Sequence, residues 1–283
     1  MNSTGDGNLG MDGLRSDAWL HLITNLQAQF PNILSSERWI FVLGSLLTYY
    51  LAFWGQNFIL YILYKLNAFP EYQIQAGAKA DKELVWRNLK DTIFSHIVLL
   101  PLMVYFLYDL FIFRGTKILS PLPPTSIILR DLLIALVCVD TFGYWGHRAV
   151  HHKSVYKYIH KQHHEYKVTV GIASVFANPL EDILVNTWSS LSGCLIMGSH
   201  VVVLWIWLAI RVSEAVNSHS GYHFLPYWLT DLFSAGEFHE YHHSHNIGNY
   251  GAFTTFWDKL MGSDVHFKQY LQQKIESKKL KKQ

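Results

Sequence analysis

Residues 147–164 read HRAVHHKSVYKYIHKQHH, and this short stretch holds six histidines. Two further clusters follow it, HSGYH at residues 219–223 and HEYHH at residues 239–243. The chain has 16 histidines in all. Thirteen of them lie between His147 and His245, so they are concentrated in one part of the sequence. Residues three and four apart share a face of a helix, so each cluster can direct two or three imidazoles toward a common centre.

The spacing of these clusters favours a pair of metal ions. Imidazole is a ligand for iron, zinc, copper and nickel. A structural zinc site needs about four ligands and usually includes cysteine. Here eleven histidines follow the patterns HxxxHH, HxxHH, HxxxH and HxxHH, which is enough for two metals with five ligands each. A solvated polyhistidine tract would be contiguous, and these clusters are separated along the chain.

The composition indicates a membrane protein. The chain has 283 residues, of which 50% are hydrophobic and 16% are charged, whereas a soluble domain carries about 25% charged residues. The formal net charge of +2 gives no reason to expect a nucleic-acid partner. Cys138 and Cys194 both lie in apolar runs. They predict neither a disulfide framework nor a cysteine metal site.

Apolar segments of membrane length predict the fold class, an all-α integral membrane helical bundle. A helix that crosses a bilayer needs about 20 mostly apolar residues. Three stretches meet this requirement, at residues 39–63, 92–113 and 126–145. A fourth apolar region, residues 183–212, is long for one span and short for two. Since histidine clusters lie on both sides of it, we expect a hairpin that dips into the bilayer and returns.

Basic residues suggest that the histidine-rich di-metal site lies on the cytosolic face. Lysine and arginine mark cytoplasmic loops, and they are frequent in residues 65–89 and in the last residues of the chain. The expected domain organisation follows from these segments. It comprises an N-terminal tail with a short surface helix (1–37), membrane spans with a basic loop (38–125), a catalytic domain (126–265) that includes the hairpin 183–212, and a basic C-terminal tail (266–283).

The histidine clusters and their neighbours resemble those of the fatty acid hydroxylase superfamily. The likeness covers about residues 90–265 and rests on DTFGYWGHR at 140–148, HHEY at 163–166, HSGYHF at 219–224, FHEYHH at 238–243 and GNY at 248–250. Only seven residues separate His152 from His160, which is typical of the hydroxylase branch. Within that branch the chain is most similar to sterol C4-methyl oxidases. It departs from them at residues 177–181, which read ANPLE.

The resemblance implies the chemistry and a ligand set. It implies two non-haem iron ions, O2 as co-substrate, and hydroxylation of a lipid, most closely a sterol C4-methyl group. One metal would be held by His147, His160, His163, His239 and His242, and the other by His152, His164, His219, His223 and His243. His151 and His245 would then support these ligands. Electrons would come from NAD(P)H through cytochrome b5 or a similar carrier.

Several further expectations accompany this interpretation. Metal-bound imidazoles usually donate their second N–H to a carboxylate or carbonyl, so Asp140 is a candidate for orienting His147, with Tyr144 on the same helical stripe. Glu181 and Glu214 are weaker candidates for similar roles. The sequence KLKKQ at 279–283 has the KxKxx form of a retrieval signal to the endoplasmic reticulum membrane.

Alternative functions remain open at this point. One is hydroxylation of a fatty acid, a sphingolipid or another position of a sterol. Another is hydrolysis at zinc, which imidazole ligands also allow. A third is a non-catalytic metal-binding or transport protein of the membrane. Transport would predict polar or histidine residues inside several spans, whereas here the histidines gather at the ends of spans.

Overall fold

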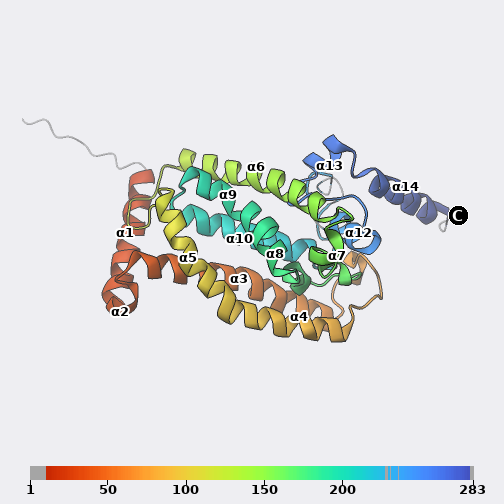
Figure 1. Cartoon of the computed structure of the whole chain (residues 1–283), viewed down its shortest axis with the longest axis horizontal. Coiled ribbons are helices and arrows are strands. Elements are labelled where there is room, and N and C mark those ends of the chain that lie inside the picture. The colour runs from red at the N-terminus through yellow and green to blue at the C-terminus, as the bar shows by residue number, and fades with distance from the viewer. Residues whose placement is uncertain (1–10, 227–228, 230, 235, 281–283) are drawn as a thin grey trace, which may run out of the picture.

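The computed structural model describes residues 11–226, 229, 231–234 and 236–280, and they form a bundle of helices (Figure 1). No strand occurs among these residues, which confirms the expected all-helical fold. The helices are α1 Met11–Gln29, α2 Pro31–Leu34, α3 Glu37–Lys65, η1 Pro70–Tyr72, α4 Lys82–Phe94, η2 Ser95–Leu99, α5 Leu100–Phe113, α6 Thr125–Val150, α7 Tyr156–Ile159, η3 His163–Glu165, η4 Gly171–Val175, α8 Pro179–Glu181, η5 Asp182–Thr187, α9 Trp188–Met197, α10 Val201–Ser218, α12 Glu237–His245, α13 Phe256–Met261 and α14 Val265–Leu280.

Three helical segments of the described chain are long and apolar enough to cross a membrane. Two of them are α3 and α10. The third is the continuous segment Lys82–Phe113, which comprises α4, η2 and α5. Their outward faces carry large apolar side chains such as Leu51, Phe58 and Phe106, each more than 60% exposed. Exposure of such an apolar surface to water is unfavourable, whereas the hydrocarbon chains of lipids can cover it. The chain is therefore an integral membrane helical bundle.

The helix expected over residues 126–145 is α6, which is longer than expected and is not one of the three candidate spans. It carries Arg130, Asp131 and Asp140. Asp131 is buried, and it accepts hydrogen bonds from Arg130 and from Ser199 of the turn before α10 (2.8 Å). Charged side chains that are paired in this way can be held inside a bundle.

The region expected to form a hairpin consists of η5, α9 and α10. The chain turns at residues 198–200, and α10 then runs back along α9, as the hydrogen bond from the Trp207 indole to the Ser190 carbonyl shows (2.7 Å). α9 packs against α6, where a Cβ on Gly193 would lie 2.4 Å from the Cα of Ala135. α10 packs against α3, where the indole of Trp205 donates to Ser45 (3.0 Å).

Two π-helical segments, η2 and η5, interrupt the long helices. η2 precedes Pro101, whose ring cannot donate a backbone hydrogen bond and would clash in a regular helix. One extra residue in the turn relieves that clash. η5 follows α8 and brings Asp182 and Asn186 to the interior of the bundle.

The two ends of the chain extend the bundle in opposite directions in Figure 1. α1 begins at Met11, within the segment 1–37 that was expected to hold a short surface helix, and the sequence 1–10 lies outside the described residues. The basic C-terminal segment forms α14, and the last three residues of the KxKxx sequence lie outside the described residues. α14 follows α13 and contacts α12 through Phe267 and Tyr241.

We expect Gly193→Ala to destabilise the bundle by about 1–3 kcal/mol, because the added methyl group would force α9 away from the backbone of α6. The matched control is Gly55→Ala, also inside a helix, where a Cβ meets no atom within 4 Å. Thermal unfolding of both variants in detergent measures the difference. An unchanged melting temperature for Gly193→Ala would contradict the close packing of α6 and α9.

Candidate metal centre

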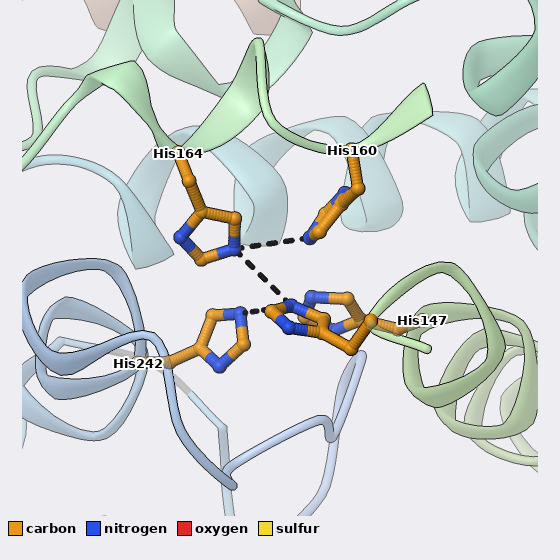
Figure 2. Close-up of side chains that lie close together, drawn as sticks. His147, His160, His164 and His242 are labelled. Atoms are coloured by element: carbon orange, nitrogen blue, oxygen red, sulfur yellow. Dashed lines mark hydrogen bonds between the residues drawn. The ribbon is translucent and has the colours of Figure 1, made fainter. Parts of the chain in front are cut away.

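Five histidines gather at the end of the bundle where α6, α7 and α12 meet. In this five-histidine group, one ring nitrogen of each residue lies within 4.8 Å of those of all the others. Its members are His147, His151, His160, His164 and His242. Figure 2 shows His160 and His164 facing His147 and His242, with their nitrogens directed into the space between them.

Four more histidines form a second group beside the first. This four-histidine group consists of His163, His219, His239 and His243, and all four side chains are buried. It draws on η3, on the residue that ends α10, and on α12. α12 therefore supplies histidines to both groups, because His242 points into one and His239 and His243 into the other.

The Nδ1 atom of six of these imidazoles lies against an oxygen that can only accept a hydrogen bond. Five of the six acceptors are backbone carbonyls and one is the carboxylate of Glu181. The pairs are His147–Tyr250 O (3.1 Å), His160–Glu181 Oε1 (2.8 Å), His163–Phe176 O (3.2 Å), His219–Ala215 O (2.8 Å), His242–Gly248 O (2.6 Å) and His243–Tyr166 O (3.1 Å). Each Nδ1 must therefore donate, which leaves a lone pair on Nε2.

These lone pairs face one another at short range. The Nε2 atom of His219 lies 3.3 Å from that of His163 and 3.2 Å from that of His243. All three imidazoles carry their proton on Nδ1, so no hydrogen bond can join their Nε2 atoms. Unprotonated nitrogens this close repel each other unless a cation lies between them.

The separations also match the size of a metal ion. Ligand nitrogens about 2.1 Å from one ion lie about 3.0 Å apart when their bonds to it are perpendicular. In the four-histidine group the Nε2 atoms of His219 and His239 are 3.0 Å apart. In the five-histidine group the same atoms of His160 and His164 are 3.0 Å apart. The residues present thus fit two metal ions.

Burial prepares the imidazoles for this role. It lowers the pKa of His163 to about 4 and holds the pKa values of His242 and His243 well below the usual range. Neighbouring histidines lower the pKa values of His242 and His243 further. At neutral pH these side chains are unprotonated, which is the form that binds a metal.

A tight turn after α12 supplies two of the acceptor carbonyls. Asn246, Gly248 and Asn249 all have positive φ angles, between 55° and 61°, which asparagine and glycine adopt most readily. The turn folds the chain back, so the Gly248 carbonyl meets His242 and the Tyr250 carbonyl meets His147. The local sequence therefore fixes the tautomers of ligands on two different helices.

A buried carboxylate holds α12 against two loops. Glu240 follows His239 in the chain and accepts hydrogen bonds from Gln75 and Thr169. The amine of Lys167 donates to the backbone carbonyl of His243 (3.1 Å). These contacts tie α12 to the chain at residue 75 and at residues 167–169.

The grouping differs from the one that the family resemblance implied. His151 belongs to the five-histidine group, with its Nε2 atom 3.1 Å from that of His242, whereas His152 is exposed. α6 ends here, and positions 147 and 151, four apart, share the face toward the site. His151 lies on the same helical stripe as Asp140, Tyr144 and His147. The spacing of these residues in the sequence could therefore have identified His151 as a member of the site.

The other differences arise where the expected helices stop. α10 ends at Ser218, so His219 and His223 are not an i, i+4 pair on one helix. His223 lies outside both groups, where its backbone N–H donates to the Tyr72 carbonyl (2.8 Å). The tight turn of η3 sends His163 to the four-histidine group and His164 to the five-histidine group, whereas they were expected to act with other partners.

The residues expected to support the ligands have other contacts. Asp140 accepts from the backbone N–H (2.8 Å) and hydroxyl of Thr254, so it anchors a loop rather than His147. The hydroxyl of Tyr144 bonds that of Ser263 (2.9 Å). His245 is exposed and stacks on Tyr241. Glu181 does contact a clustered histidine, and the carbonyl acceptors could not have been found from residue types because they are backbone atoms.

A large cavity leads from the histidines into the bundle. This central cavity lies between α3, α5, η5, α9 and α10, and the empty space in it and at its open side is about 1480 Å³. Its walls are mostly apolar, with Phe41, Leu46 and Val104 among them. Five clustered histidines line its inner end, namely His147, His160, His163, His219 and His239. An elongated apolar molecule in this cavity would reach both histidine groups.

Comparison with known proteins bears on the same region. A family model described as fatty acid hydroxylase matches residues 132–263. The chain is 32% identical to methylsterol monooxygenase 1 of Rattus norvegicus over 259 residues, which cover 87% of this chain and 86% of that protein. It is also 32% identical to very-long-chain aldehyde decarbonylase GL1-8 of Oryza sativa subsp. japonica, over 90% of this chain and 93% of that protein. No solved structure gives a significant match.

We expect His151→Ala to lower the metal affinity of the five-histidine group by more than about 10-fold, because it removes a converging nitrogen. His152→Ala is the matched control, since its side chain lies outside both groups. Metal retained after dialysis against a chelator, measured by elemental analysis, compares the two. Loss of metal in His152→Ala with full retention in His151→Ala would support the division implied by the resemblance instead.

Glu181→Ala should weaken metal binding by about 10- to 100-fold, because His160 loses the acceptor that fixes its tautomer. Glu181→Gln keeps an acceptor oxygen and should bind metal more tightly than the alanine variant. Glu165→Gln is the control, because Glu165 is exposed and pairs with Arg87. Equal metal content in Glu181→Ala and the unsubstituted protein would contradict this role.

Proposed function

The chain belongs to the fatty acid hydroxylase family, and from that membership we propose that it is an O2-dependent, non-haem di-iron sterol C4-methyl monooxygenase. Its family makes it an oxidoreductase of the oxygenase class that acts on lipids. The observation that carries the proposal is the contact between cavity and ligands. The walls of the central cavity are apolar, and its inner end is formed by histidines of both groups.

The five-histidine and four-histidine groups would each hold one iron ion. When bound, the two ions supply the redox chemistry that activates O2 toward an unreactive C–H bond, which side chains cannot do alone. The backbone carbonyls and Glu181 keep the Nδ1 atoms occupied, so that each Nε2 atom is directed to its ion. Ligands that need no rearrangement hold a reactive centre in a fixed geometry.

The helices around the cavity bind the lipid and exclude water. Residues from α3, α5 and α10 form nearly half of the wall, and these helices belong to the segments long enough to cross a membrane. A lipid can therefore pass between bilayer and cavity without entering water. A dry cavity also protects reactive species from side reactions.

The sterol assignment rests on the similarity to methylsterol monooxygenase 1 over most of both chains. A very-long-chain aldehyde is the second candidate substrate, because the rice aldehyde decarbonylases are equally similar. A fatty acid or sphingolipid would fit the same apolar cavity. Direct comparison of these lipids decides between them.

Electrons would come from NAD(P)H through cytochrome b5 or a similar carrier. The lysines at positions 153, 157 and 161 are exposed beside the five-histidine group, which gives an acidic carrier a basic surface to approach. This surface would face the cytosol, and the catalytic domain would comprise residues 126–265. The KxKxx sequence at 279–283 supports residence in the endoplasmic reticulum membrane.

The test is turnover by the purified, iron-loaded protein with cytochrome b5, its reductase, NADH and labelled O2. A 4-methyl sterol should yield a product that carries label at the methyl carbon, and very-long-chain aldehydes should react more slowly. His163→Ala should lower turnover by at least about 100-fold, while His245→Ala, exposed and outside both groups, should retain it. Reaction of the aldehydes alone would favour the second candidate, and no O2-dependent product from any lipid would overturn the proposal.

A further inference from the structure

An ion pair lies in the wall of the otherwise apolar central cavity. The guanidinium of Arg211 bonds the carboxylate of Glu214 through Nη1, and both residues line the cavity. Their side chains are only 15% and 12% exposed. Both belong to α10, a helix long and apolar enough to cross a membrane. Charged residues in such a helix are costly to hold and commonly mark a binding site.

The position of the pair along α10 places it about two helical turns from His219 of the four-histidine group. Arg211, Ala215 and His219 follow one another at intervals of four residues, so they share one stripe of the helix. His219 turns back along that stripe, because its Nδ1 atom donates to the Ala215 carbonyl (2.8 Å). Arg211 lies one further turn before Ala215, so it is about 12 Å from His219 along the axis.

The rest of the cavity offers an apolar molecule a different environment. α3 and α10 run in the same direction, since Ser45 meets Trp205 and Gln56 meets Ser213. The end of the cavity at Phe41 and Leu204 is therefore the one away from His219. There the rings of Phe41 and Phe111 lie with their centroids 5.4 Å apart. The cavity is thus polar beside the ligands and apolar beyond them.

Arg211 also keeps hydrogen-bonding capacity beyond the ion pair. A guanidinium has five N–H donors, and the contact with Glu214 uses Nη1. The buried Nε atom has no hydrogen-bond partner in the part of the chain that the structure describes. An oxygen of a bound lipid is the natural acceptor for such a donor, and a buried donor left without one is costly.

We propose that Arg211 and Glu214 recognise a hydroxyl or carbonyl oxygen of the lipid substrate and orient that end toward the metals. The hydrocarbon remainder then lies toward Phe41 and Phe111. This inference rests on the proposed function and deepens it: the oxidised carbon lies within a few bonds of an oxygen. A 3-hydroxyl next to a C4-methyl group meets this requirement, whereas the terminal methyl of a long acyl chain does not.

The test compares two sterols that differ only in the 3-hydroxyl group, using the full-length iron-loaded protein. The hydroxylated 4-methyl sterol should have a kcat/KM at least about 10-fold above that of its 3-deoxy analogue. In the double variant Arg211→Met, Glu214→Gln this preference should fall to about one, with turnover of the 3-deoxy sterol retained. Changing both residues avoids leaving one charge buried without its partner.

Two controls separate recognition from a structural role. Ser213→Ala changes a neighbouring polar residue of α10 that contacts Gln56 of α3, and it should keep the full preference. A double variant that lost turnover of both sterols in proportion, or that kept the preference, would overturn the inference. Equal turnover of both sterols by the unsubstituted protein would overturn it as well, while leaving the proposed sterol oxidation intact. Turnover of neither sterol would instead overturn the proposed function.

Discussion

The structure depends on one constraint. Unprotonated Nε2 atoms of several imidazoles face one another at about the contact distance of two nitrogen atoms. Nδ1 atoms that donate to backbone carbonyls force the lone pairs of His163, His219 and His243 into a common space. That arrangement is unfavourable in an empty protein and favourable around a cation. The loops, the short helices and the buried contacts of Glu240 serve to hold these nitrogens together against their repulsion.

The membrane helices provide the frame for this arrangement. Close packing of α9 on α6 and of α10 on α3 fixes the ends from which His147 and His219 project. The same helices form the walls of the central cavity, so the site and its access route share one set of packing contacts. A small displacement of α10 would therefore move both the Arg211–Glu214 ion pair and His219.

Sequence reasoning predicted the helical membrane fold and the participation of the histidine clusters, because apolar length and residue spacing are local properties. It did not predict how the histidines divide into the two groups, since that depends on where helices end. α10 stops one residue before His219, and η3 separates His163 from His164. The carbonyl acceptors could not be predicted for a different reason. Every residue has a backbone carbonyl, and at residues 246–250 the conformation of the turn decides which carbonyls meet an imidazole.

The shared role of α12 sets the order in which the protein can be assembled. During translation, α12 emerges after α3, α5, α6 and α10, and both histidine groups lack at least one wall until it does. A nascent chain can therefore insert its apolar helices while its ligands are still open to the solvent. Metal binding would then be a late step, because both histidine groups are completed only when α12 packs against the other helices.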